Sequence, residues 1–169
     1  MLKNIDIRSI HDNPFALIGD QWTLITAGDQ NVYNTMTASW GGLGVLWSRP
    51  VATVYVRPQR YTYGFMEKND YFTLTFFAPG ERREALNLCG SKSGRDMDKF
   101  AASGLTAAFA ACGAPYVAEG ELVLVCRKLF AQDLEAESFL DRTIIDKNYP
   151  GGDFHRMYVG EIIEAYRRG

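Results

Sequence analysis

The stretch Tyr71-Phe-Thr-Leu-Thr-Phe-Phe77 places threonine at every second position between aromatic and aliphatic residues. This period of two predicts a half-buried β-strand, which the turn residues Pro79-Gly80 bring to an end. Two more stretches favour strands: Trp22-Thr-Leu-Ile-Thr-Ala27, ended by Gly28-Asp29, and the β-branched Val51-Ala-Thr-Val-Tyr-Val56. The sequence therefore predicts a fold built mainly of strands.

The rest of the chain adds long strands near the C-terminus and short helices between the strands. We expect strands at 121–130 and 155–166, and helices at 60–69, 81–88 and 96–103. Asp96 is the expected N-cap of the last helix, and Gly104 is the residue that ends it. With five to eight strands and no linker or repeat, residues 1–169 are predicted to form one β-rich (α+β) domain. Its expected architecture is an antiparallel barrel, closed or nearly closed, with short inserted helices.

Composition and charge exclude several classes of function. The chain has 169 residues, 47% hydrophobic and 22% charged, which is ordinary for a globular protein with a buried core. Its net charge of −2 lacks the basic excess that binding to a nucleic-acid backbone needs. No apolar run reaches membrane-spanning length, and the N-terminus lacks the apolar core of a signal peptide. We therefore expect a cytoplasmic protein that binds neither nucleic acid nor a membrane.

Cysteine and histidine are too scarce for the common metal sites. The three cysteines are an odd number without C-x-x-C spacing: Cys89, Cys112 and Cys126. We expect each to be a buried, small apolar residue, and we expect no metal site. With only His11 and His155, an H-E-x-x-H metallohydrolase is excluded. His155 follows a predicted turn at 149–152, where it either faces a cleft or is an ordinary surface or core residue.

Three stretches concentrate polar side chains. Asn34-Thr-Met-Thr-Ala-Ser-Trp40 could read the edge of a planar heteroaromatic ligand, or it is an edge strand that faces water. Arg57-Pro-Gln-Arg-Tyr-Thr62 puts two arginines at a predicted helix start, which is typical of an anion site, although such arginines are often only solvated. Cys89-Gly-Ser-Lys-Ser-Gly-Arg-Asp96 is either an anion-binding loop or a flexible turn, and it lacks the Gly-Lys pair of a P-loop.

Five segments in one order resemble the flavin reductase-like, FMN-binding split-barrel family, and in particular its flavoredoxin branch. They are residues 34–40, 57–62, 67–72, 91–100 and 155–161. The resemblance extends over residues 20–165. It implies an antiparallel split β-barrel that forms a homodimer and holds FMN near the dimer interface.

The same resemblance implies which residues form the site. Residues 37–40 would lie by the isoalloxazine ring or the ribityl chain, and residues 91–95 in a loop that closes over the flavin from the same or the partner subunit. Arg57, Arg60 and Thr62 would meet the phosphate. His155 would border the ring or the nicotinamide pocket, and it is the expected catalytic residue. The full expected cofactor-binding set is Asn34, Thr35, Met36, Thr37, Ala38, Ser39, Trp40, Arg57, Arg60, Tyr61, Thr62, Ser91, Lys92, Ser93 and Arg95.

The activity implied by the resemblance is an NAD(P)H-dependent oxidoreductase. Hydride or electrons would pass from NAD(P)H through bound FMN to a free flavin, a ferric complex or a redox partner protein. The chain has no G-x-G-x-x-G after a strand, which fits a nicotinamide that stacks on the flavin instead of occupying a Rossmann site. The alternative is an FMN-binding electron carrier or storage protein without NAD(P)H turnover. Phosphate contacts alone do not distinguish FMN from FAD.

Overall fold

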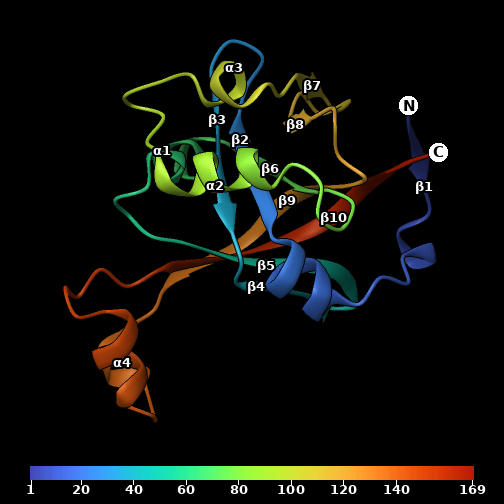
Figure 1. The fold of residues 1–169 in the computed structure, drawn as a ribbon. Coiled ribbons are helices and arrows are strands. Elements are labelled where there is room, and N and C mark those ends of the chain that lie inside the picture. Colours follow the sequence, from blue (N-terminus) through green and yellow to red (C-terminus); the bar gives the residue numbers. More distant parts are fainter.

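The computed structural model describes residues 1–169, and its main feature is an eight-stranded antiparallel sheet (Figure 1). The strands follow the order β3-β2-β6-β9-β10-β5-β4, and β1 pairs with β10. The bounds are β1 Leu2–Ile5, β2 Thr23–Gly28, β3 Tyr33–Ala38, β4 Gly41–Leu46, β5 Arg49–Val56, β6 Tyr71–Phe76, β9 Leu122–Asp133 and β10 Arg156–Arg168. A separate hairpin consists of β7 Ala107–Phe109 and β8 Pro115–Val117. The β-rich, antiparallel prediction is confirmed, but ten strands form instead of five to eight.

The helices are short and lie between strands. Their bounds are α1 Tyr61–Lys68, α2 Arg83–Ser91, α3 Lys99–Ser103 and α4 Thr143–Asn148, with single-turn 3-10 helices at Ile7–Ser9 and Ala136–Ser138 and a π-helix at Ala16–Gln21. The expected cap of α3 was wrong by two residues, because Asp98 and not Asp96 accepts from the first backbone N–H groups of the helix. No helix is long and apolar enough to cross a membrane.

Strand β6 lies in the middle of the sheet between β2 and β9, and it is buried on both faces. The prediction of a half-buried strand was therefore wrong. The threonine face is covered by the β7–β8 hairpin: Thr73 Oγ1 donates to the Pro115 carbonyl at 2.7 Å, and Thr75 Oγ1 accepts from Val117 N at 3.4 Å. A threonine can occupy such a position because its hydroxyl finds a partner on the covering element.

The long strands β9 and β10 connect the two halves of the sheet, and both bend at bulges in their pairing. Gly160 lies at one bulge, where a Cβ would be 2.7 Å from the Phe72 ring and 2.9 Å from Cys126. Only glycine lets the strand pass this close to the core. The sheet stays open at its ends because β3 and β4, which follow one another in the chain, do not pair with each other.

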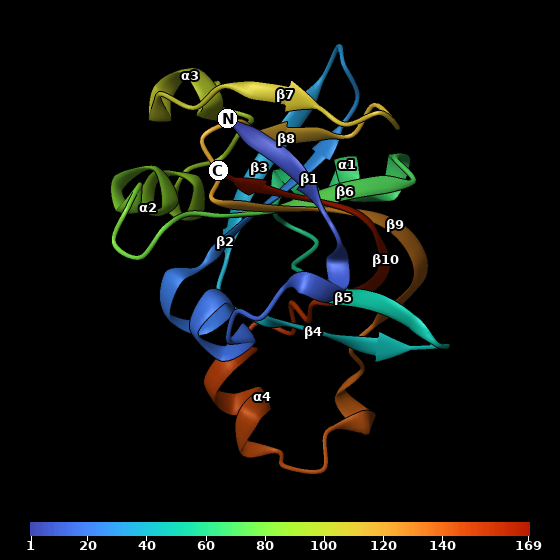
Figure 2. The same cartoon turned by 90° about the vertical axis from the view of Figure 1, so that its right-hand side faces the viewer.

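Strand β4 was not predicted, and neither was the helix in the α4 region, which is the segment 134–155 between β9 and β10. No strand was predicted for Gly41-Gly42-Leu43-Gly44, which forms most of β4 and pairs with β5. Three glycines hide this strand, because glycine carries no β-strand signal. Between β9 and β10, the chain leaves the sheet and carries α4 away from it in both views (Figure 1, Figure 2).

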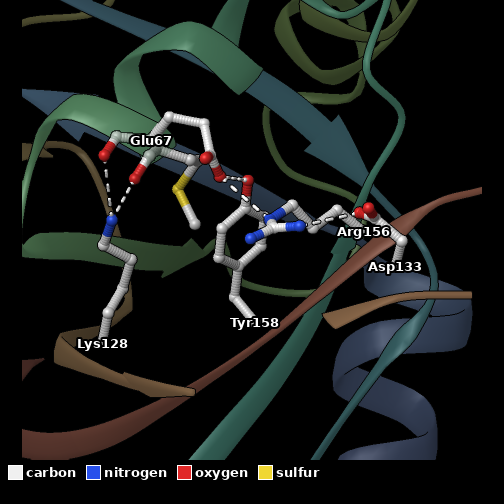
Figure 3. A network of polar contacts seen from close by, with 6 residues as sticks. Glu67, Lys128, Asp133, Arg156 and Tyr158 are labelled. Atoms are coloured by element: carbon white, nitrogen blue, oxygen red, sulfur yellow. Dashed lines mark hydrogen bonds and ion pairs between the residues drawn. The ribbon is translucent and has the colours of Figure 1, made fainter. Parts of the chain in front are cut away.

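A polar network fixes the C-terminal end of α1 to the sheet (Figure 3). The buried Tyr158 donates to Glu67 Oε1 at 2.6 Å, and Arg156 Nε lies 3.1 Å from the same oxygen. Lys128 Nζ donates to the Met66 carbonyl, one of the last carbonyls of α1. A cation at this end also complements the helix dipole. The network therefore anchors α1, whose N-cap is Arg60, to β9 and β10.

Candidate functional site

A pocket of about 180 Å³ lies beside the end of β3, next to the end of β5 and the start of β10. Its lining includes two arginines and no acidic residue. The lining residues are Met36, Thr37, Ala38, Ser39, Trp40, Tyr55, Arg57, Arg60 and His155. A neighbouring hollow of about 280 Å³ shares Thr37 and Ser39 with it, so the two adjoin along β3.

Aromatic rings form one wall of the pocket. The imidazole of His155 lies 5.3 Å from the Trp40 ring, 6.4 Å from Tyr55 and 5.5 Å from Tyr149, measured between ring centroids. Tyr55 lies near the end of β5, two residues before Arg57, and both side chains line the pocket. Sequence reasoning missed Tyr55, although this spacing could have found it.

His155 is buried and uncharged at neutral pH. Burial, and secondarily the nearby positive charge of Arg57, lowers the pKa of the His155 imidazole from 6.5 to about 4. Asp153 opposes this shift without overcoming it. Nδ1 of the ring is 2.7 Å from the Tyr149 hydroxyl oxygen. The group at the pocket wall is therefore a neutral imidazole, not an imidazolium acid.

Arg57 holds the base of the α4 region against the pocket. Its guanidinium donates to the Asp153 carboxylate and, at 2.8 Å, to the Asn148 carbonyl, and it lies 5.0 Å from the Tyr149 ring centroid. Gln59 Nε2 also donates to Asp153, at 2.6 Å. The charge of Arg57 is thus compensated inside the chain, although a guanidinium carries five N–H donors and three remain for a ligand.

Arg60 and Lys99 converge on the C-terminal end of α2 without any carboxylate partner. Arg60 donates to the carbonyls of Gly90 at 2.8 Å and Cys89 at 3.1 Å. Lys99, almost fully buried, donates to the carbonyls of Cys89 at 2.8 Å and Thr35 at 3.0 Å. Burial, and next the Arg60 charge, lowers the pKa of Lys99 to about 8. Two partly desolvated cations in contact with the Cys89 carbonyl make the space between the C-terminal end of α2 and β3 strongly positive.

Lys99 was not predicted as a site residue, although it lies in the segment 91–100 that carries the family resemblance. It is the first residue of α3, where a lysine is normally exposed, and it becomes buried only because α3 packs beside α2 and β3. Burial of the neighbouring Cys89 raises the pKa of its thiol, so that cysteine is a small apolar residue as expected. Cys126 is buried as well, whereas Cys112 is half-exposed, and none of the three is bonded to another.

Several predicted site residues lie beneath the pocket and not in its wall. Asn34 Nδ2 donates to Thr62 Oγ1 at 2.7 Å, and both side chains are buried. The Thr35 hydroxyl is 2.9 Å from that of Thr26, so it faces the inside of the sheet. The alternative of an edge strand facing water is therefore wrong for residues 34–36, because α1 and α2 cover this part of β3.

The predicted 91–95 loop lies around two other hollows. Ser91 lines the 280 Å³ hollow beside Thr37. Arg95 lines a third hollow of about 510 Å³ together with Asn34, Tyr61 and Lys99, and its guanidinium lies 5.0 Å from the Tyr61 ring centroid. Lys92 is exposed and Ser93 is half-buried. The structure thus brings Thr37, Ala38, Ser39, Trp40, Arg57, Arg60 and His155 together, and it places the 91–95 loop at their margin.

This arrangement suits a planar ligand that carries an anionic group. Aromatic rings and the apolar part of Met36 offer stacking surface, and the hydroxyls of Thr37 and Ser39 offer hydrogen bonds. The Thr37 hydroxyl already donates to the Leu86 carbonyl at 2.6 Å, so it remains an acceptor for a ligand. Arg60 and Lys99 would supply the positive charge that an anion needs.

Comparison with known proteins identifies the family. Residues 15–169 match the family described as "Flavin reductase like domain". The chain belongs to the flavin reductase-like family. No curated protein matches this flavin reductase-like chain in sequence.

Solved structures agree with this family. A flavoredoxin from Methanosarcina acetivorans is 27% identical, with a TM-score of 0.66 over 88% of this chain and 68% of that one. An FMN-binding protein from Thermus thermophilus is 20% identical, with a TM-score of 0.68 over 98% and 77%. An NADH:FAD oxidoreductase from Streptomyces globisporus, solved with NAD and FAD fragments, is 21% identical, with a TM-score of 0.63 over 88% and 75%. The fold is therefore that of split-barrel flavin reductase structures, as predicted.

Proposed function

We propose that this flavin reductase-like chain binds FMN along β3, in the groove formed by the 180 Å³ pocket and the adjoining 280 Å³ hollow. It would transfer hydride or electrons from NAD(P)H to an acceptor. The convergence of Arg60 and Lys99 on the Cys89 carbonyl, with no carboxylate beside them, carries this proposal. Two partly buried cations repel each other, and an anionic ligand group would remove that cost. The terminal phosphate of FMN supplies such a group, and the Thermus FMN-binding protein and the Methanosarcina flavoredoxin support the choice of flavin.

The chain's own residues bind and orient the cofactor. Arg60 would hold the phosphate through the N–H groups that its two backbone bonds leave free. Trp40 and His155 would flank the ring system, and Ser39 would bond its polar edge. When bound, FMN supplies the redox chemistry, taking up a hydride or electrons and passing them on. The neutral His155 would contact the ring or the nicotinamide as a hydrogen-bonding group and not as a general acid, because its low pKa keeps the imidazole uncharged at pH 7.

Absorption spectroscopy and flavin titration test this proposal. The purified chain is titrated with FMN, FAD and riboflavin while flavin fluorescence is followed, and NADH or NADPH is then added without oxygen. We expect tight FMN binding, weaker riboflavin binding and bleaching of the flavin spectrum by a nicotinamide. A chain that takes up none of the three flavins would overturn the site assignment.

A second function is an electron carrier or storage protein that binds FMN without NAD(P)H turnover. The similarity to the Methanosarcina flavoredoxin favours it, since that neighbour is named as a redox protein and not as a reductase. Bleaching by a reduced partner protein, and not by NADH or NADPH, would select this function. A His155→Ala variant distinguishes the reductase from the carrier further. In a reductase it should slow reduction by nicotinamide more than it weakens FMN binding, whereas a carrier has no such reduction to slow.

We also propose that the chain forms a homodimer. The hairpin of β4 and β5 exposes Val45, Leu46 and Trp47, and the Trp47 ring lies 6.3 Å from that of the exposed Phe130. Large apolar side chains gathered in this way are typical of an interaction surface. Size-exclusion chromatography with light scattering measures the mass of the protein in solution. A Trp47→Glu variant that stays dimeric would place the interface elsewhere.

A further inference from the structure

The contact between Tyr149 and His155 assigns a role to a residue outside the pocket lining. Tyr149 belongs to the α4 region, which leaves the sheet between β9 and β10. Its side chain is buried, and its hydroxyl oxygen lies 2.7 Å from Nδ1 of His155. Nδ1 makes the imidazole's one hydrogen bond within the chain, while Nε2 makes none and is not sealed from the pocket that His155 lines.

The chemistry of the two groups decides which one donates. His155 is neutral at pH 7, and burial raises the pKa of Tyr149, so both groups are uncharged. A phenol O–H is far more acidic than a neutral imidazole N–H, and the unprotonated imidazole nitrogen accepts better than a phenol oxygen. The Tyr149 hydroxyl therefore donates to Nδ1. The ring proton of His155 must then be on Nε2, because the bond at one ring nitrogen sets the state of the other.

Arg57 holds Tyr149 in place for this bond. The guanidinium lies 5.0 Å from the Tyr149 ring centroid and donates to the carbonyl of Asn148, the residue just before it. Its ion pair with Asp153 fixes the other side of the same turn, two residues before His155. Because of these contacts, Tyr149 and His155 approach the pocket as one unit.

We propose that Tyr149 is a positioning residue that fixes His155 as the Nε2–H tautomer, so that the pocket meets a neutral hydrogen-bond donor. Its acceptor would be an oxygen or ring nitrogen of the bound flavin or nicotinamide, and this part rests on the proposed function. The groups that face the imidazole are Arg57, Asp153, Tyr55, Tyr149 and Trp40. None of the others makes a hydrogen bond with the ring, so the tautomer depends on Tyr149 alone.

Two-bond ¹H–¹⁵N correlation spectra of the full-length ¹⁵N-labelled chain at pH 7, with and without FMN, report the tautomer directly. The chain has two histidines, and the exposed His11 serves as an internal reference. We expect His155 to be protonated at Nε2 in the natural chain, and both tautomers to be populated in Tyr149→Phe. Tyr55→Phe is the matched control, since it removes a pocket tyrosine hydroxyl without a bond to His155, and it should leave the tautomer unchanged.

Two results would overturn this role: a proton at Nδ1 in the natural chain, or a pure Nε2–H tautomer in Tyr149→Phe. The natural chain is measured first, so the outcome does not depend on the folding of a variant. In FMN titrations, Tyr149→Phe should weaken binding about twofold, because only the fraction of chains that keep the Nε2–H tautomer binds as before. Unchanged affinity would show that the Nε2–H group does not meet the flavin. If the natural chain bound no FMN, the proposed function would fail while the tautomer assignment stood.

Discussion

Replacing Arg60 by alanine tests whether its guanidinium binds the phosphate of FMN. The substitution removes the guanidinium that lines the pocket and donates to the carbonyls of Gly90 and Cys89. If Arg60 also holds the FMN phosphate, the variant loses a hydrogen bond between two charged groups. Such a bond contributes about 1.5–3 kcal/mol, which corresponds to FMN affinity about 10- to 150-fold weaker.

The cost to folding is smaller and can be separated from the binding effect. The Cys89 carbonyl keeps Lys99 as a donor in Arg60→Ala, so only the Gly90 carbonyl loses its side-chain partner. We expect a loss of about 1–2 kcal/mol in stability. For a chain of this length, that lowers the melting temperature by about 2–8 °C, and the folded protein is still available for titration.

A matched control and a second ligand make the assay specific. Arg168→Ala also removes a guanidinium that donates to two backbone carbonyls, those of Ala118 and Gly120, but at the far end of β10 from His155. It should leave FMN affinity unchanged in fluorescence titration. Riboflavin, which lacks the phosphate, should bind the natural chain and Arg60→Ala almost equally.

Two outcomes would refute the reasoning. FMN affinity within about threefold of the natural chain, in a folded Arg60→Ala variant, would mean that the guanidinium does not meet the phosphate. An equal loss of affinity for FMN and riboflavin would mean that Arg60 acts on the ring end of the site or only on its structure.

Three other predictions concern stability, each measured by urea unfolding. Tyr158→Phe removes the bond to Glu67 and should cost about 1.5–3 kcal/mol, because the acceptor is charged; an unchanged midpoint would contradict the network. The natural chain should lose stability as the pH falls from about 6.5 to about 4. Over that window the histidine of the unfolded chain binds a proton, whereas the buried His155 of the folded chain stays unprotonated. The slope of the free energy of unfolding from this group is at most about 1.4 kcal/mol per pH unit. His155→Gln should lack that component, and an identical pH dependence would refute the pKa assignment. Gly160→Ala should cost about 1–3 kcal/mol by crowding a buried ring, whereas Gly42→Ala, which meets nothing within 4 Å, should be much milder.

Local pattern was enough to find most of the strands. The stretches 22–27, 51–56 and 71–77 each form a strand within two residues of the predicted bounds, because alternation and β-branching act over neighbouring residues. Strand β4 was missed because its glycines carry no such pattern and its pairing with β5 forms it. The burial of both faces of β6 was missed because the covering hairpin comes about 40 residues later in the chain.

The candidate site shows the same division. Arg57 and Arg60 could be singled out because a helix start directly follows a strand, and that arrangement is visible in a short stretch of sequence. Tyr149 and Lys99 could not, since each gains its role from a partner on another element. No local pattern tells a lysine at a helix start that is solvated from one that is buried against a strand more than 60 residues away.

The sequence by itself determined the strand-rich class, the family resemblance and the polar segments that surround the groove, because all of these depend on residue type and spacing. The tertiary structure alone decided which of those polar groups meet. It buried Asn34 and Thr35 of β3 beneath α1 and α2, it paired Asn34 with Thr62 of α1, and it brought Lys99 beside Arg60. Burial and the proximity of charges set hydrogen-bonding state and pKa, and both arise only when distant segments pack together.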